Sequence, residues 1–200
     1  SIFAELVQSF NDTVADLGFT LLLATHGYDL RAEHQVLRKL LEHRVDGIAL
    51  IGLDHSDDTY QLLISRDVPV VAAWSFSETS RISCIGSDNR EAGRHAAKHL
   101  LSFGHRRVGL VFPPTQENDR ARDRLEAVEL ELRDAGIEIP DRWRVRSPYS
   151  VAHAKSVCRE LLSEHKDITG LICGNDIIAQ GAVSSAMQLG LRIPEDLSIV

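Results

Sequence analysis

Five side chains stand where short apolar runs of the chain end or where the next helical stretch begins. They are Trp74, Asp88, Arg124, Tyr149 and Asn175, and Asn89, Arg122 and Asp176 stand in the same places beside them. A carboxylate accepts hydrogen bonds from hydroxyls, a guanidinium donates them, and a flat ring covers the apolar face of a sugar. These residue types together favour a polyhydroxylated small-molecule ligand.

Each of these side chains also has a purely structural interpretation. Asp88 precedes Glu91 by three residues, which is the spacing of a helix capping box. Asn175 or Asp176 could cap the following helix, and we favour Asn175 as the one that faces a ligand. Arg124 could lie in a solvated charged helix face, and both aromatic rings could be core or rim side chains. No one of these signals is specific by itself.

The composition excludes several classes of function. The 200 residues carry 22 Lys+Arg against 29 Asp+Glu, a net charge of −7, which argues against a nucleic-acid groove in this stretch. No apolar run approaches the roughly 18 to 20 residues that span a bilayer, and the N-terminus does not resemble a signal peptide. The three cysteines, Cys84, Cys158 and Cys173, are far apart, which is typical of a reducing cytoplasm.

Motifs of common enzyme classes are absent from the sequence. There is no glycine-rich dinucleotide or phosphate loop and no G-x-S-x-G. His95 and His99 have the i, i+4 spacing of a zinc site, but no acidic residue follows His95 to complete that motif. We therefore expect no catalysis, no cofactor and no metal.

Apolar runs and helical patterns alternate along the whole chain. Helical stretches are expected at 88–103, 119–135, 150–164 and 176–189, and the expected strands are 21–24, 47–51, 68–73, 82–86, 107–112, 142–146, 170–173 and 197–200. Strands that alternate with helices of this length predict parallel sheets, with ligands at the carboxyl ends of the strands. The sequence predicts an α/β fold of two doubly wound parallel-sheet subdomains. Their expected ranges are 1–100 and 101–200.

The order of these segments resembles the effector-binding domain of the LacI/GalR family of bacterial transcription regulators. The resemblance covers nearly the whole chain. It is visible in Asp88-Asn89, Gly104-His105-Arg106-Arg107-Val108-Gly109 and Asn175-Asp176, and its most specific piece is the closing run from Gly190-Leu191-Arg192-Ile193-Pro194 to Val200.

The resemblance implies a periplasmic-binding-protein-like fold with a ligand cleft between two lobes. It implies that Asp88 binds hydroxyls, Arg124 reaches in from the second lobe, Tyr149 forms an aromatic wall and Asn175 is a polar contact. Ile2 and Phe3 would stand at the cleft wall, and Trp74 would lie close to another cleft position. The family's helix-turn-helix module, its first strand and the segment after Val200 are not in this sequence, so we expect either a fragment of a longer chain or an incomplete folding unit.

These observations predict the effector-sensing domain of a cytoplasmic, homodimeric transcription regulator. Its partners would be a small molecule, with a sugar or sugar derivative as the default, and operator DNA contacted only through the missing N-terminal module. A periplasmic sugar-binding transport receptor is the alternative, and an enzyme on a related two-lobed scaffold is a third. A signal peptide upstream would favour the receptor, and a helix-turn-helix would favour the regulator.

Overall fold

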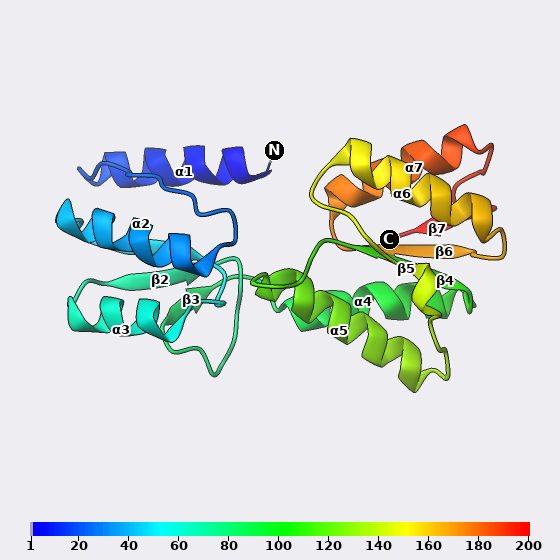
Figure 1. Cartoon of the computed structure of the whole chain (residues 1–200), viewed down its shortest axis with the longest axis horizontal. Coiled ribbons are helices and arrows are strands. Elements are labelled where there is room, and N and C mark those ends of the chain that lie inside the picture. The colour runs from blue at the N-terminus through cyan, green and yellow to red at the C-terminus, as the bar shows by residue number, and fades with distance from the viewer. Residues whose placement is uncertain (1) are drawn as a thin grey trace. The chain divides into compact units, whose positions relative to one another are not determined.

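The computed structural model describes the backbone of residues 2–200 and the side chains of residues 4–200, and it divides into two compact units. Unit 1 comprises Ser1–Gly47 and His55–Pro69, and unit 2 comprises Ile48–Asp54 and Val70–Val200. Both units are drawn in Figure 1. Each is described below by itself.

Unit 1 consists of three helices and their connections. They are α1 (Ile2–Asp16), α2 (Leu30–Glu42) and α3 (Asp57–Ser65). Asp29 caps α2 by accepting hydrogen bonds from two backbone N–H groups of its first turn, and Ser56 caps α3 in the same way from Thr59. Helices α2 and α3 pack on each other, and Leu37 and Leu63 are almost fully buried.

Two expectations for the beginning of the chain differ from the structure. The run 21–24, expected as a strand, forms neither strand nor helix, and Leu23 is 66% exposed. An apolar run becomes a strand only when a neighbouring strand supplies its ladder of hydrogen bonds. The spacing of Leu6, Val7, Phe10, Val14 and Leu17 predicts a helix with one apolar stripe, and helix α1 forms over most of this range. The stripe is only partly covered, because Phe10 and Leu17 remain exposed.

The first sheet of unit 2 has three parallel strands in the order β1-β2-β3. They are β1 (Ile48–Ile51), β2 (Val70–Ala73) and β3 (Ser83–Ile85). The second sheet is also parallel, with the order β5-β4-β6-β7. Its strands are β4 (Val108–Phe112), β5 (Arg144–Arg146), β6 (Gly170–Cys173) and β7 (Ser198–Ile199). The predicted α/β class with parallel sheets is confirmed.

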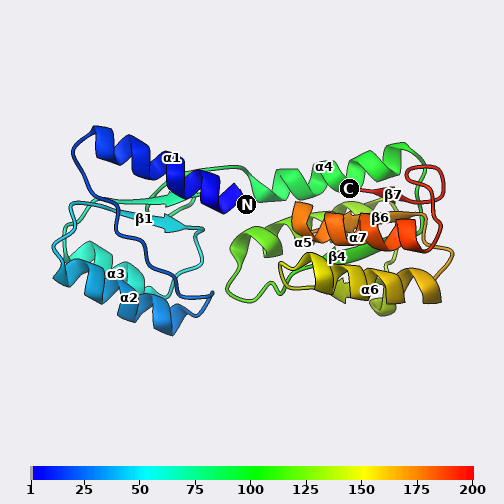
Figure 2. The same cartoon turned by 90° about the horizontal axis from the view of Figure 1, so that it is seen from above.

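Four helices accompany the second sheet: α4 (Asn89–Ser102), α5 (Asp119–Asp134), α6 (Val151–Glu164) and α7 (Asp176–Gln188), with a short 3-10 turn η1 (Asp141–Trp143) before β5. Helix α4 packs on α5 and α6 packs on α7. Figures 1 and 2 show the two pairs on opposite faces of the sheet. The α4–α5 approach needs Gly93, because a Cβ there would lie 2.3 Å from the carbonyl oxygen of Arg124.

The hydrophobic core of unit 2 surrounds β4, all five residues of which are buried. Leu171 and Ile172 of β6 and Val128 of α5 contribute fully buried side chains. Leu100 of α4 belongs to the same core, so α4 packs with the second sheet although the sequence placed residues 1–100 in a first lobe. That division into lobes after residue 100 stays a prediction. Because the helices and strands of this sheet share one core, the core also holds the beginning of each helix near the carboxyl end of the strand before it.

Candidate functional site

The loops at the carboxyl ends of the strands of unit 2 converge on the first two turns of α5. Residues 118–124 of α5 and its cap contact the loops that follow β1, β2, β3, β5 and β6. Carboxyl ends of parallel strands are where ligands of open α/β sheets bind. This convergence is therefore the candidate ligand site.

Arg124 is held by groups from two of these loops. Its Nε donates a hydrogen bond to the carbonyl oxygen of Gly174 at 3.1 Å, and its Nη1 donates to Oδ1 of Asn89. Asn89 is 6% exposed, and its Nδ2 donates to the carbonyl oxygen of Trp74 at 3.4 Å. The structure thus joins Arg124 to the Trp74 backbone through Asn89, a residue that the sequence analysis places beside Asp88 after a strand but does not select for the site.

Asp88 and Asn175 are both helix caps. Oδ1 of Asp88 accepts from the backbone N–H groups of Arg90 and Glu91 at 2.9 and 3.0 Å, while Oδ1 of Asn175 accepts from Ile178 N–H at 3.0 Å. Asp88 is exposed. The capping bonds of both residues end on Oδ1. Capping therefore uses neither Oδ2 of Asp88 nor Nδ2 of Asn175, and a ligand could bind these atoms without displacing a cap. Their ligand-binding roles stay predictions.

Tyr149 and Trp74 come from loops on two different sheets. The Tyr149 hydroxyl accepts a hydrogen bond from Nδ2 of Asn118 at 2.9 Å, and Asn118 also caps α5 through its Oδ1. Trp74 adopts a φ of 69°, a left-handed conformation that is rare for a bulky residue. Backbone strain of this kind persists where the surroundings fix it, and it clusters at functional sites.

The sequence analysis missed a buried carboxylate at the same helix start. Oδ2 of Asp119 accepts hydrogen bonds from the Leu53 backbone N–H at 2.7 Å and from the Ser75 hydroxyl at 2.8 Å. Its Oδ1 pairs with Nη1 of Arg120 at 2.9 Å. Asp119, Arg120 and Ser75 are 5%, 9% and 3% exposed. Asn118-Asp119 stands between a predicted strand and helix, as Asp88-Asn89 does, and this position was the available signal.

A second ion pair joins α5 to the loop after β1. The two Nη atoms of Arg122 donate to the two carboxylate oxygens of Asp54 at 2.5 and 2.8 Å. This bond to Asp54 raises the pKa of the Arg122 guanidinium above its usual value. Burial raises the pKa of the neighbouring Asp123 carboxyl, against the opposing effect of Arg90 and Arg122. Two parallel charge-assisted bonds fix orientation as well as proximity.

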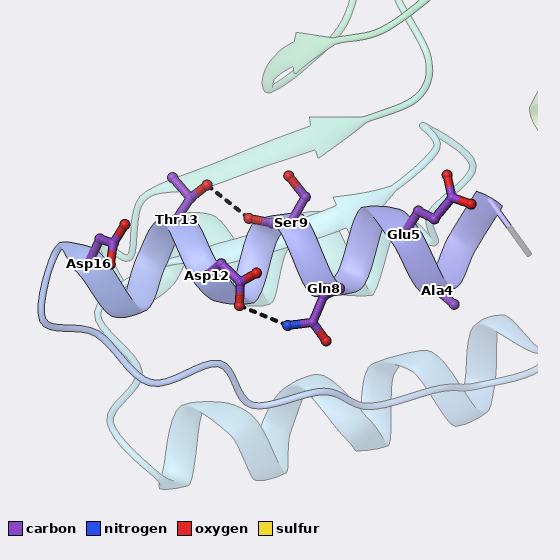
Figure 3. Close-up of a pocket in the computed structure, with 7 residues that line it drawn as sticks. All are labelled: Ala4, Glu5, Gln8, Ser9, Asp12, Thr13 and Asp16. Atoms are coloured by element: carbon purple, nitrogen blue, oxygen red, sulfur yellow. Dashed lines mark hydrogen bonds between the residues drawn. The ribbon is translucent and has the colours of Figure 1, made fainter.

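Ile2 and Phe3 lie outside the residues whose side chains are described, so their expected place at a cleft wall stays a prediction. A shallow hollow on unit 1, shown in Figure 3, runs along α1 and contains none of the other predicted site residues. One helix alone lines it, with the residues Ala4, Glu5, Gln8, Ser9, Asp12, Thr13 and Asp16. A single exposed helix face of this kind has no converging ligand groups.

Unit 1 contains a separate buried polar cluster. Glu33 is 3% exposed, and its Oε2 lies 2.9 Å from Nδ1 of His55 and 3.4 Å from Nε2 of His26. The ring of His55 meets Tyr60 edge-on at 5.6 Å. Among the described residues no group of three His, Cys, Asp or Glu side chains has a geometry that could hold a metal ion. No helix in that part of the chain is long and apolar enough to cross a bilayer.

Comparison with known proteins places this arrangement among regulators. The HTH-type transcriptional repressor PurR of Klebsiella pneumoniae subsp. pneumoniae is 28% identical over 200 residues, which is 99% of this chain and 58% of the repressor. The transcription regulator GntR from Chromobacterium violaceum superposes with a TM-score of 0.89 at 30% identity, over 100% of this chain and 73% of that one. The transcriptional regulator CelR in its cellobiose complex gives 0.78 and 27%, over 98% and 60%.

The chain therefore spans less than two thirds of the length of the curated relatives that it matches. The family model described as periplasmic binding proteins and sugar binding domain of the LacI family matches residues 1–200. Because this match covers every residue, the chain belongs to that family.

Proposed function

We propose that the chain is the effector-sensing part of a LacI-type transcription regulator and that it binds a sugar or sugar derivative at the strand ends of unit 2. The observation that carries the proposal is the arrangement of Arg124, which bonds both Asn89 after β3 and Gly174 after β6. One similar regulator is named as a complex with cellobiose, and this supports a carbohydrate ligand. The relatives named as regulators favour this function over a transport receptor or an enzyme.

The five side chains supply complementary contacts for such a ligand. The guanidinium of Arg124 donates to a ring or hydroxyl oxygen, and Nδ2 of Asn175 adds a second donor. Oδ2 of Asp88 accepts from ligand hydroxyls while Oδ1 keeps its capping bonds. The rings of Trp74 and Tyr149 cover the apolar faces of the ligand.

These contacts convert binding into a conformational signal. Trp74 and Asp88 follow strands of the first sheet, whereas Arg124, Tyr149 and Asn175 belong to the second. A ligand that touches both sets is bound most tightly by the arrangement that brings them together, so it shifts the population toward that arrangement. In the full-length homodimer, this shift changes the spacing of two DNA-binding modules on the operator. The regulator works in the cytoplasm and performs no catalysis.

Truncation of Arg124 tests the proposal most directly. The wild-type protein is screened by thermal shift against monosaccharides, disaccharides including cellobiose, and nucleobases, because a specific ligand raises the melting temperature by mass action. Calorimetric titration of the best ligand into Arg124→Ala is expected to show affinity weakened by well over tenfold. Arg192→Ala, which removes an arginine that is 70% exposed, is the matched control and is expected to keep wild-type affinity.

Two results would contradict the proposal. Unchanged affinity in Arg124→Ala would remove this residue from the site. A nucleobase that binds while every sugar fails would overturn the ligand class, and turnover of a bound sugar would revive the enzyme.

A further inference from the structure

The carboxylate of Asp119 joins three segments that are far apart in the sequence. Oδ2 bonds the Leu53 N–H, 66 residues away, and the Ser75 hydroxyl, 44 residues away. Oδ1 is occupied by Arg120. All three bonds form inside unit 2 at a carboxylate that is 5% exposed, so each is shielded from competing water.

The Arg122–Asp54 pair repeats the same connection one helical turn later. Asp119 and Arg122 are three residues apart and share one face of α5. Both reach the loop after β1, Asp119 through the Leu53 backbone and Arg122 through the Asp54 side chain. The four bonds between this face of α5 and the loops after β1 and β2 are called the α5 latch below; they end on Leu53, Asp54 and Ser75.

We infer that Asp119 and Arg122 are positioning residues whose latch holds the loops after β1 and β2 against α5 through protein groups alone. Each bond of the latch has both its donor and its acceptor in this chain, so none of them needs a ligand. Ser75 follows Trp74 directly, and the Trp74 carbonyl accepts the hydrogen bond from Asn89, which also bonds Arg124. The latch residues and Arg124, the proposed ligand-binding arginine, therefore lie at the same end of α5 and are connected through Ser75, Trp74 and Asn89.

As a consequence, the α5 latch increases the fraction of molecules in the arrangement that binds ligand. When only part of the molecules is competent to bind, the apparent dissociation constant rises in inverse proportion to that fraction. Breaking the latch would lower the competent fraction and weaken binding although neither residue touches the ligand. This consequence rests on the proposed function, whereas the latch itself does not.

Distances between two spin labels test the latch without a ligand. Labels are attached at Ser83→Cys in β3 and Met187→Cys in α7, which are both exposed positions. The first label reports the position of the first sheet, and the second reports the position of the second sheet. Cys84 is replaced by serine, and the native Cys158 and Cys173 stay. Burial raises the pKa of the Cys158 thiol to about 12 and also raises that of Cys173, which disfavours the thiolates that react with the label. The Cys84→Ser protein without the two new cysteines is labelled in parallel, and it is expected to take up no label.

In this background the latch is weakened in two steps. Asp54→Asn removes only the partly exposed ion pair and leaves every bond of Asp119 in place, so we expect this variant to fold. A second single variant, Asp119→Asn, replaces the buried carboxylate by an amide and so weakens its bonds to Leu53, Ser75 and Arg120. We expect one narrow distance distribution in the parent, a second and longer population in Asp54→Asn, and a larger one in Asp119→Asn.

A matched control and a rescue separate positioning from general damage. Asp196→Asn breaks the other bidentate pair, Arg192–Asp196, which lies at the surface, and is expected to leave the distribution unchanged. The double swap Asp54→Arg with Arg122→Asp restores the pair with reversed charges and is expected to restore the narrow distribution. Parent-like distance distributions in both Asp54→Asn and Asp119→Asn would overturn the inference. It would also be overturned if the charge swap failed to restore the narrow distribution and Asp196→Asn broadened the distribution as much as Asp54→Asn does.

A second measurement tests the consequence for binding. With the sugar that raises the wild-type melting temperature most, Asp54→Asn is expected to weaken affinity three- to tenfold, and the charge swap to recover it. If no sugar binds the wild type, the proposed function fails, while the distance measurement still decides on the latch.

Discussion

Two carboxylates are buried to the same degree and are used differently. Glu33 in unit 1 is 3% exposed and Asp119 in unit 2 is 5% exposed. Two histidines share Oε2 of Glu33, and its Oε1 has no hydrogen-bond partner. Both oxygens of Asp119 are partnered, by a backbone N–H, a hydroxyl and a guanidinium.

The difference lies in what each carboxylate holds together. The partners of Glu33 are 7 and 22 residues away, within the helices and connections of unit 1. Asp119 bonds partners 44 and 66 residues away, at the ends of two strands of the first sheet. A fully satisfied buried network specifies one arrangement, whereas an unsatisfied oxygen carries a desolvation penalty. Burial alone therefore does not distinguish the two acids, whereas the origin of their partners does: only Asp119 joins the ends of two strands.

Substitution of Asp119 should lower the free energy of unfolding more than substitution of Glu33 does. Asp119→Ala leaves a buried arginine, an N–H and a hydroxyl without their acceptor, so we expect unfolding free energy to fall by about 3–5 kcal/mol. Glu33→Gln keeps the shape of a side chain that already lacks one partner, and we expect a loss of about 1 kcal/mol. Urea unfolding of both variants measures the difference. Equal losses would show that the network around Asp119 gives no added stability.

Two glycines sharpen the comparison at the backbone. Gly52, directly before Leu53, has a φ of +89°, and a Cβ there would lie 2.0 Å from Nη1 of Arg120 and 2.7 Å from Oδ1 of Asp119. Gly104 has a similar φ of +80° but no atom within 4 Å of such a Cβ. It is the matched control for backbone strain alone.

Gly104→Ala should therefore cost about 1 kcal/mol, the strain of a left-handed alanine. Gly52→Ala carries the same strain and must also push Arg120 away from Asp119, so we expect a total loss of about 2–3 kcal/mol. Thermal unfolding of both variants measures the two losses. If they agree, Arg120 moves aside freely and its bond to Asp119 adds nothing.

Much of the fold follows from local patterns in the sequence. The predicted helices at 119–135 and 176–189 lie within one residue of α5 and α7, because a capping residue begins each and a glycine follows each. The strand expected at 21–24 was wrong, because pairing with a neighbour is not a local property. The same apolar character that predicted β6 correctly was insufficient there.

The candidate site was predictable only in part. Position after a strand identified Trp74 and Asn175, and position near the start of a predicted helix identified Arg124. Asp54 and Asp119 obey the same positional rule, but their bonded partners are 68 and 66 residues away, and such pairs become visible only when the sheets are in place. Asn89 was passed over because Asp88 beside it offers the capping signal, although the buried side chain is that of Asn89.

The smallest expected effect contrasts the buried Asp119 with Asp196 at the surface. Bonds from the side chain and backbone of Arg192 lower the pKa of Asp196 to about 2, from an ordinary value of 3.8. A carboxyl whose pKa is lower in the folded state stabilises the fold above its unfolded pKa and loses that contribution as the pH falls through its folded pKa. The stabilising contribution of Asp196 is thus complete above about pH 4 and disappears toward pH 2.

Asp196→Asn should accordingly be slightly less stable than the wild type at pH 6, and the two proteins should converge between pH 4 and pH 2. Urea unfolding at a series of pH values measures this difference. The difference is small because the partner, Arg192, is 70% exposed and water competes for every bond of the pair. A difference that persisted unchanged at pH 2 would show that the asparagine disturbs packing near β7, because only an ionised carboxylate loses its advantage on protonation.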